Sequence, residues 1–158
     1  MERYQKLMIG HGLLVTFVSL LAGFMLIFKL VGGLEIWPGN IMPISVYGTS
    51  EGWVRAHTGG LTNGLLVVIF ALALPKLDLS AVMNRFCAWG LIYVAWSFTI
   101  FYWIGNAVGN RALTMGDNPM GESSLLSLVG FLPGLPSIFL APIILYIGAR
   151  AALRGLKD

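Results

Sequence analysis

Four long stretches of apolar residues, separated by more polar segments, dominate the pattern of the chain. A helix that crosses a bilayer needs about 20 mostly apolar residues. The stretches of that length are roughly Leu7–Leu30, Trp53–Leu74, Phe86–Ala107 and Leu125–Gly148. The first is longer than the apolar core of a signal peptide and lacks a clear Ala-x-Ala site, so we expect it to be retained. The pattern predicts an all-α protein built as a bundle of four transmembrane helices.

The segments between these stretches differ in character. The segment between the second and third stretches is short, whereas the other two are long and rich in turn-forming residues. In residues 31–52, Pro38, Pro43 and several glycines preclude a regular helix. The fourth apolar stretch also holds three prolines, whose kinks neighbouring helices can tolerate. They are Pro133, Pro136 and Pro142.

The composition agrees with a membrane protein of one domain, residues 1–158. Hydrophobic residues make up 57% of the chain and charged residues 11%. Soluble domains carry roughly 25% charged residues. A single cysteine, Cys87, excludes an internal disulfide and a cysteine-rich metal site. We therefore interpret the chain as an integral membrane protein.

The basic residues indicate how the helices are oriented. With four spans, both termini lie on one side, and that side carries seven bases: Arg3, Lys6, Lys76, Arg85, Arg150, Arg154 and Lys157. The other side carries three: Lys29, Arg55 and Arg111. The positive-inside rule then makes both termini cytoplasmic. Because the bases lie at the ends of the apolar stretches, they indicate topology and not nucleic-acid binding.

A polar cluster, "RAHTGGLTNG" at residues 55–64, opens the second apolar stretch. From the helical rise, His57 lies about 6 Å and Asn63 about 15 Å inside the outer boundary. In the third stretch, Tyr102 lies about 8 Å and Phe98 about 14 Å inside it. Polar groups at such depths are costly and tend to be functional. The matching depths predict one pocket, framed by two antiparallel helices in the outer half of the membrane.

His57 is the candidate cofactor ligand of this pocket. One histidine cannot form a tight zinc or calcium site alone, but it can hold a haem, whose porphyrin supplies four nitrogens. Gly60 and Gly64 share the His57 face, where a flat macrocycle or another helix could approach closely. The other histidine, His11, is too far along the bundle to clamp the same haem. The second axial position would then be open, which favours binding or chemistry at the iron.

Structural alternatives stand beside these assignments. His57 could simply hydrogen-bond a neighbouring helix, and Gly60-x-x-x-Gly64 is a helix-packing motif. Asn63 could join helices, and Tyr102 could be an interfacial aromatic residue. For His11, in "GHG" near the cytoplasmic end of the first stretch, we predict a structural hydrogen bond between helices.

Four blocks resemble one known family. They are "GHG" in the first stretch, "EGWVRAHTGGLTNG" entering the second, "WSFTIFYW" in the third and "NRALTMGDNPMG" after it. In this order they are similar to the styrene oxide isomerases, small bacterial membrane enzymes. The resemblance extends from about Gly10 to about Pro133.

The resemblance implies a homotrimer of four-helix subunits in the bacterial inner membrane, with haem b bound between subunits by His57. It implies isomerisation of aryl epoxides to aldehydes, as in styrene oxide to phenylacetaldehyde, a Meinwald rearrangement. Asn63 and Tyr102 match family residues that orient the epoxide. We expect ferric haem to act as a Lewis acid, with a 1,2-hydride shift. Phe98 and Phe101 are candidate walls for an apolar substrate that arrives through the lipid.

One position departs from the family pattern, in which an asparagine follows Trp-Ser. Phe98 takes that place here, so the chain could be a homologue that acts on a different epoxide. Two other classes stay open. One is a membrane b-type haem protein for electron transfer or gas sensing. The other is a non-enzymatic membrane subunit. A small transporter is disfavoured because no inverted repeat and no intramembrane acid are seen.

Overall fold

The computed structural model describes residues 3–154. Its helices are α1 (Arg3–Val31), α2 (Ser50–Ala73), α3 (Ala81–Gly105) and α4 (Leu125–Arg154). A hairpin of β1 (Gly33–Trp37) and β2 (Asn40–Pro43) follows α1, and the 3₁₀ turn η1 (Leu74–Lys76) follows α2. The four predicted helices are confirmed, with ends that shift by up to six residues.

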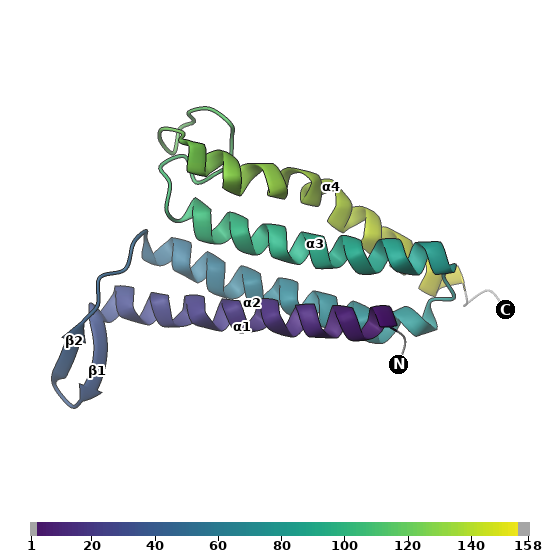
Figure 1. Cartoon of the computed structure of the whole chain (residues 1–158), viewed down its shortest axis with the longest axis horizontal. Coiled ribbons are helices and arrows are strands. Elements are labelled where there is room, and N and C mark those ends of the chain that lie inside the picture. The colour runs from purple at the N-terminus through teal and green to yellow at the C-terminus, as the bar shows by residue number, and fades with distance from the viewer. Residues whose placement is uncertain (1–2, 155–158) are drawn as a thin grey trace.

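The four helices run alongside one another, and α3 lies between α4 and the pair formed by α1 and α2 (Figure 1). The beginning of α1 and the end of α4 lie at the same end of the molecule. Each helix is long and apolar enough to cross a membrane. These are the features of a multi-pass membrane protein, whereas insertion and the cytoplasmic side of the termini stay predictions. Lys157, which contributes to the charge argument, lies outside the described residues.

Small residues bring α1 and α2 into close contact. A methyl group added at Gly64 would lie 2.3 Å from the Thr16 hydroxyl oxygen and 2.7 Å from the Gly12 carbonyl oxygen. One added at Gly60 would lie 2.8 Å from Cβ of Ser19. The two glycines therefore serve helix packing. The prediction that they give a flat cofactor its approach is corrected, because α1 already occupies that space.

Polar side chains join the helices at two further points. The indole N–H of Trp96 on α3 donates to His11 Nδ1 on α1 at 3.1 Å, which confirms the predicted structural role of His11. The hydroxyl of Tyr93 on α3 donates to the carbonyl of Pro133 on α4 at 3.0 Å. This bond joins α3 to α4 at the first of the three prolines in α4.

Between α1 and α2, residues 32–49 form no helix, which confirms the prediction for all but the ends of the segment 31–52, but the β-hairpin within them was not predicted. Its turn contains Gly39, whose φ of +81° lies in the left-handed region that favours glycine. The chain then returns to α2, where Thr49 caps the helix by accepting a hydrogen bond from Gly52 N–H at 3.0 Å. The cap fixes where α2 begins and therefore the height of the polar cluster that follows.

Candidate active site

His57 lies on the face of α2 that packs against α1. Its Nδ1 is 2.9 Å from the Ser19 carbonyl oxygen, and the Ser19 hydroxyl donates in return to the His57 carbonyl. Ser19 is fully buried. Because a carbonyl can only accept, Nδ1 carries the proton and Nε2 keeps its lone pair. A metal-binding histidine typically donates its other ring N–H to a carbonyl or carboxylate, which fixes the orientation of the imidazole.

The imidazole of His57 lies in an apolar groove between α1 and α2. A methyl group at Gly23 would lie 2.9 Å from both Cε1 and Nδ1 of the ring, so only glycine gives the imidazole this position. The other residues that line the groove are Leu20, Phe24, Leu26 and Ile27. The ring is half-buried. The arrangement presents one neutral nitrogen ligand on an apolar surface.

Tyr102 lies on a different face of α2, against Gly59. A methyl group at Gly59 would lie 2.5 Å from Cε2 of the Tyr102 ring, so the glycine lets the phenol cross close to the helix. Phe98 is stacked on Tyr102, with ring centroids 6.2 Å apart and planes at 22°. Phe101 contacts the same ring at 5.5 Å. Phe98, Phe101 and Tyr102 thus form an aromatic cluster on α3.

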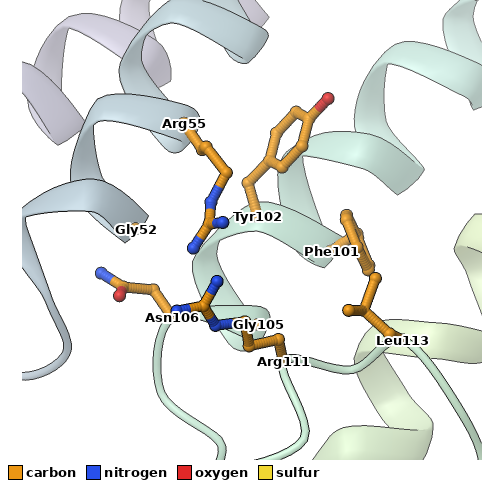
Figure 2. A pocket seen from close by; sticks show the side chains of 8 residues that line it. All are labelled: Gly52, Arg55, Phe101, Tyr102, Gly105, Asn106, Arg111 and Leu113. Atoms are coloured by element: carbon orange, nitrogen blue, oxygen red, sulfur yellow. The ribbon is translucent and has the colours of Figure 1, made fainter. Parts of the chain in front are cut away.

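A small cavity opens beside Tyr102, at the end of the bundle opposite to the start of α1 (Figure 2). It holds about 120 Å³. Arg55 reaches into it from α2, and Arg111 reaches into it from the loop that follows α3. The remaining lining residues are Gly52, Phe101, Gly105, Asn106 and Leu113. The cavity thus combines aromatic surface with two cationic donors.

An apolar cavity of similar volume, about 120 Å³, lies between α3 and α4. It shares two lining residues, Phe101 and Leu113, with the cavity beside Tyr102. Phe98 contributes to its α3 side, and Phe131 contributes to its α4 side. Asn63 lies one turn along α2 from Gly59, on the same face. Its amide nitrogen is buried and, within the described residues, has no hydrogen-bond partner. A buried donor without a partner is rare in proteins, but Asn63 is not in the lining of either cavity.

The buried side chain of Asn110 organises the loop at residues 106–124. Its amide nitrogen donates to the carbonyls of Thr114 (3.1 Å) and Gly116 (3.0 Å). Its amide oxygen accepts from Ala112 N–H at 3.0 Å. Arg111 and Ala112 have φ values of 56° and 54°, a left-handed backbone that costs energy in residues other than glycine. The Asn110 hydrogen bonds hold this conformation and so direct Arg111 to the cavity.

The single pocket predicted from matching depths is not present within one chain. Depth fixes the height of a residue but not its direction around the helix. His57 and Gly59 are two residues apart, so their side-chain directions differ by about 200°. His57 consequently contacts Ser19 of α1, while Tyr102 contacts Gly59 from α3. The pairing of His57 with Tyr102 is therefore corrected to two half-sites on different faces.

Haem fits the donor set better than a metal ion held by side chains alone. In residues 3–154 no group of three His, Cys, Asp or Glu side chains could hold a metal ion. His57 offers one oriented nitrogen, and haem needs only one or two axial ligands from protein. The apolar groove beside the ring also suits a porphyrin face.

The fold and the two half-sites define a helical protein of the multi-pass membrane class that offers an aromatic cavity and a lone histidine. Residues 4–153 match the sequence pattern of the family described as styrene oxide isomerase. The chain is also 37% identical, over 133 residues, to a styrene-oxide isomerase of Pseudomonas fluorescens; the match covers 84% of this chain and 79% of that protein. The chain belongs to the styrene oxide isomerase family and is an epoxide isomerase.

Four residues of this site were not assigned to it from the sequence. Ser19 is a polar residue at mid-depth in the first stretch, and the depth comparison that found Asn63 could have found it. Asn110 lies in a block that the family resemblance already marked, but its contacts depend on the folded loop. Arg55 and Arg111 were assigned to membrane topology, and only the structure brings both guanidinium groups to one cavity.

Proposed function

We propose that the chain converts aryl epoxides to aldehydes, with styrene oxide giving phenylacetaldehyde by a Meinwald rearrangement. The benzylic C–O bond breaks, a hydride moves from the terminal carbon to the benzylic carbon, and the oxygen becomes the carbonyl. No electrons leave the substrate. The observation that carries the proposal is the aromatic cavity at Tyr102, in a chain that matches the styrene oxide isomerase family over residues 4–153.

The proposed cofactor is ferric haem b, with His57 as the axial ligand. When bound, it would supply a Lewis acid that weakens the epoxide C–O bond. The hydrogen bond from Nδ1 to the Ser19 carbonyl supports this assignment, because it leaves Nε2 free to bind iron. The absence of a Cβ at Gly23 supports it too, since it keeps the ring in the groove.

The chain's own polar groups would orient the substrate. The Tyr102 hydroxyl and the buried amide nitrogen of Asn63 are donors on the side of the molecule that carries the aromatic cavity. A donor placed where negative charge develops stabilises the transition state. The apolar walls, among them Phe98 and Phe101, would exclude water, which would otherwise trap the developing cation as a diol.

The proposed assembly is a homotrimer in the bacterial inner membrane, with the haem between neighbouring subunits and both termini cytoplasmic. Its support is the separation of the half-sites: His57 and Tyr102 lie on different faces of α2, so a second chain is needed to bring them together. The outward apolar side chains of α1 and α4 provide surface for lipid and for neighbouring subunits. An apolar epoxide would reach the site from the lipid.

Phe98 favours a second candidate, isomerisation of a different epoxide. Where the family has an asparagine, the Phe98 ring stacks on Tyr102 and lines the apolar cavity. Phe98→Asn should shift the ratio of kcat/KM between styrene oxide and an epoxide with a bulkier apolar substituent. Equal ratios in the wild type and the variant would show that position 98 does not contact the substrate.

Isotope labelling tests the reaction directly. Styrene oxide with two deuteriums on the terminal carbon should give phenylacetaldehyde that keeps both, one on each carbon of the side chain. Tyr102→Phe should lower kcat by about 10²–10³, the usual effect of removing one such donor. Tyr146→Phe, on an exposed residue of α4, is the matched control. Loss of deuterium to water, or a diol as the main product, would contradict the proposed mechanism.

A further inference from the structure

Two guanidinium groups converge in the cavity beside Tyr102. Figure 2 shows the side chains of Arg55 and Arg111 extending from different elements into the same space. No acidic side chain lines the cavity. Glu51 is exposed and interacts with both arginines only through space. Within residues 3–154 neither guanidinium makes a hydrogen bond or an ion pair, and Glu51, which lies outside the cavity wall, balances only part of their positive charge.

The position of Arg111 is enforced by its surroundings. Its φ of 56° is left-handed, and the Asn110 side chain holds the turn through Ala112 N–H. Gly105 lets the loop approach α3, since a methyl group there would lie 2.7 Å from the Arg111 carbonyl oxygen. Strained backbone is retained where the surroundings over-determine it, commonly at ligand sites. The strained turn therefore places the Arg111 guanidinium beside that of Arg55.

The rest of the cavity wall is apolar or aromatic. Phe101 and Leu113 form one side, and the Tyr102 ring forms another. The volume of about 120 Å³ admits one small ring with a short substituent. A ligand that satisfies both kinds of surface carries an oxyanion at one end and an apolar group at the other. Planar guanidinium groups match carboxylates in particular, because they can donate two parallel hydrogen bonds.

We propose that Arg55 and Arg111 form a carboxylate-binding seat that takes small arylalkanoic acids. The carboxylate lies between the two guanidinium groups, and the ring lies against Phe101 and Leu113. The inference rests on the proposed function in one respect: Tyr102 borders the seat, so a bound acid competes with the epoxide. Acids of this class are therefore inhibitors that raise the KM for the epoxide and leave kcat unchanged.

The same carboxylate chemistry has a second source, the propionate groups of the proposed haem. A propionate from a haem held by a neighbouring chain would occupy the seat permanently and exclude a free acid. The two sources are separated by loading the protein with haem b or with haem whose propionates are methyl esters. If the free acid is the ligand, phenylacetate binds equally in both preparations. If a propionate is the ligand, phenylacetate binds only to the ester-loaded protein, and the arginines still form the seat.

Direct binding tests the seat independently of catalysis. Phenylacetate and its neutral analogue phenylacetamide are titrated into the purified full chain in detergent, in both haem preparations, by calorimetry. We expect phenylacetate to bind and phenylacetamide to bind at least about tenfold more weakly. Arg55→Gln and Arg111→Gln should each weaken phenylacetate by at least about tenfold. Arg150→Gln, which removes a charge from the end of α4, is the control and should change nothing.

Arg111→Lys keeps the test conclusive if the glutamine variants misfold, because it keeps the charge and loses only the planar guanidinium group. We expect its affinity for phenylacetate to lie between those of the wild type and Arg111→Gln. Equal affinity for the acid and the amide in both preparations would overturn the inference. So would glutamine variants that fold and bind phenylacetate as the wild type does. Binding that depends on the arginines, in a protein that does not isomerise styrene oxide, would support the seat and contradict the proposed function.

Discussion

At the scale of single residues, His57 and Ser19 form a reciprocal pair that gives a lone histidine a defined state. Each side chain bonds the other residue's carbonyl, so the imidazole cannot rotate freely and, in the neutral ring, the lone pair is on Nε2. An unpaired imidazole at membrane depth would be costly. The pair therefore serves two needs, since it satisfies a buried polar group and directs one nitrogen to the groove.

Gly23→Ala tests whether this orientation matters. The added methyl group would lie 2.9 Å from two ring atoms of His57, so the ring must move and its bond to Ser19 must lengthen. We expect haem occupancy after purification to fall at least about tenfold, because losing such a partner typically weakens a metal site 10–100-fold. Gly10→Ala is the matched control, with nothing within 4 Å of the added group. Unchanged haem content in Gly23→Ala would argue against His57 as the ligand.

At the scale of elements, the loop after α3 is the least regular part of the site and the most densely hydrogen-bonded. Asn110 bonds the carbonyls of Thr114 and Gly116, and Asn118 donates back to the Asn110 carbonyl at 2.9 Å. In this loop, the hydrogen bonds of a buried amide side chain take the place of the regular backbone hydrogen bonds of a helix or sheet. The spacing of the "NRALTMGDN" block is therefore a folding requirement of the loop.

Asn110→Ala should lower stability and activity together. It leaves buried carbonyl and N–H groups without partners, each at a cost of about 1–3 kcal/mol. We expect a lower thermal midpoint in detergent and faster proteolysis within residues 108–122. The KM for the epoxide should rise as Arg111 and Leu113 lose their positions. Met115→Ala, an exposed position in the same loop, should behave as the wild type. Equal proteolysis rates in the two variants would show that Asn110 does not hold the loop.

The helices were predictable from sequence because hydrophobic length alone determines a spanning helix. Depth along the helix was predictable too, since the rise per residue is fixed. The neighbour that each side chain faces was not predictable, because it depends on which helix packs against which face. Here α1 packs against the face of α2 that carries Gly60, Gly64 and His57. The hairpin after α1 has a local turn signal, Pro38-Gly39, that was assigned only to a loop. The strained turn at Arg111 depends on contacts within the folded loop that no local pattern specifies.

At the scale of the whole molecule, one chain presents the two candidate half-sites on different faces. The histidine groove lies between α1 and α2, and the aromatic cavities lie along α3. A closed ring of identical subunits can repeat one contact between unlike faces. Such a ring would place the groove of each subunit against the aromatic side of the next. The proposed trimer is the assembly that uses both faces in this way.

Mixed assemblies test the sharing of sites between chains. His57→Ala and Tyr102→Phe subunits, each with a different tag, are co-expressed and isolated by both tags. If each site takes His57 from one chain and Tyr102 from the next, every trimer that carries both tags regains about one third of its sites. Each variant assembled alone should have nearly none. Mixed assemblies no more active than the separate variants would place both residues in one subunit's site.

The most direct measurement of the central claim is the haem spectrum of the purified protein together with its turnover of styrene oxide. We expect a Soret band and phenylacetaldehyde formation in the wild type, and the loss of both in His57→Ala. In His11→Ala the Soret band should remain, because His11 only accepts a hydrogen bond from Trp96. Full turnover by His57→Ala, or by wild-type protein without a Soret band, would contradict the account.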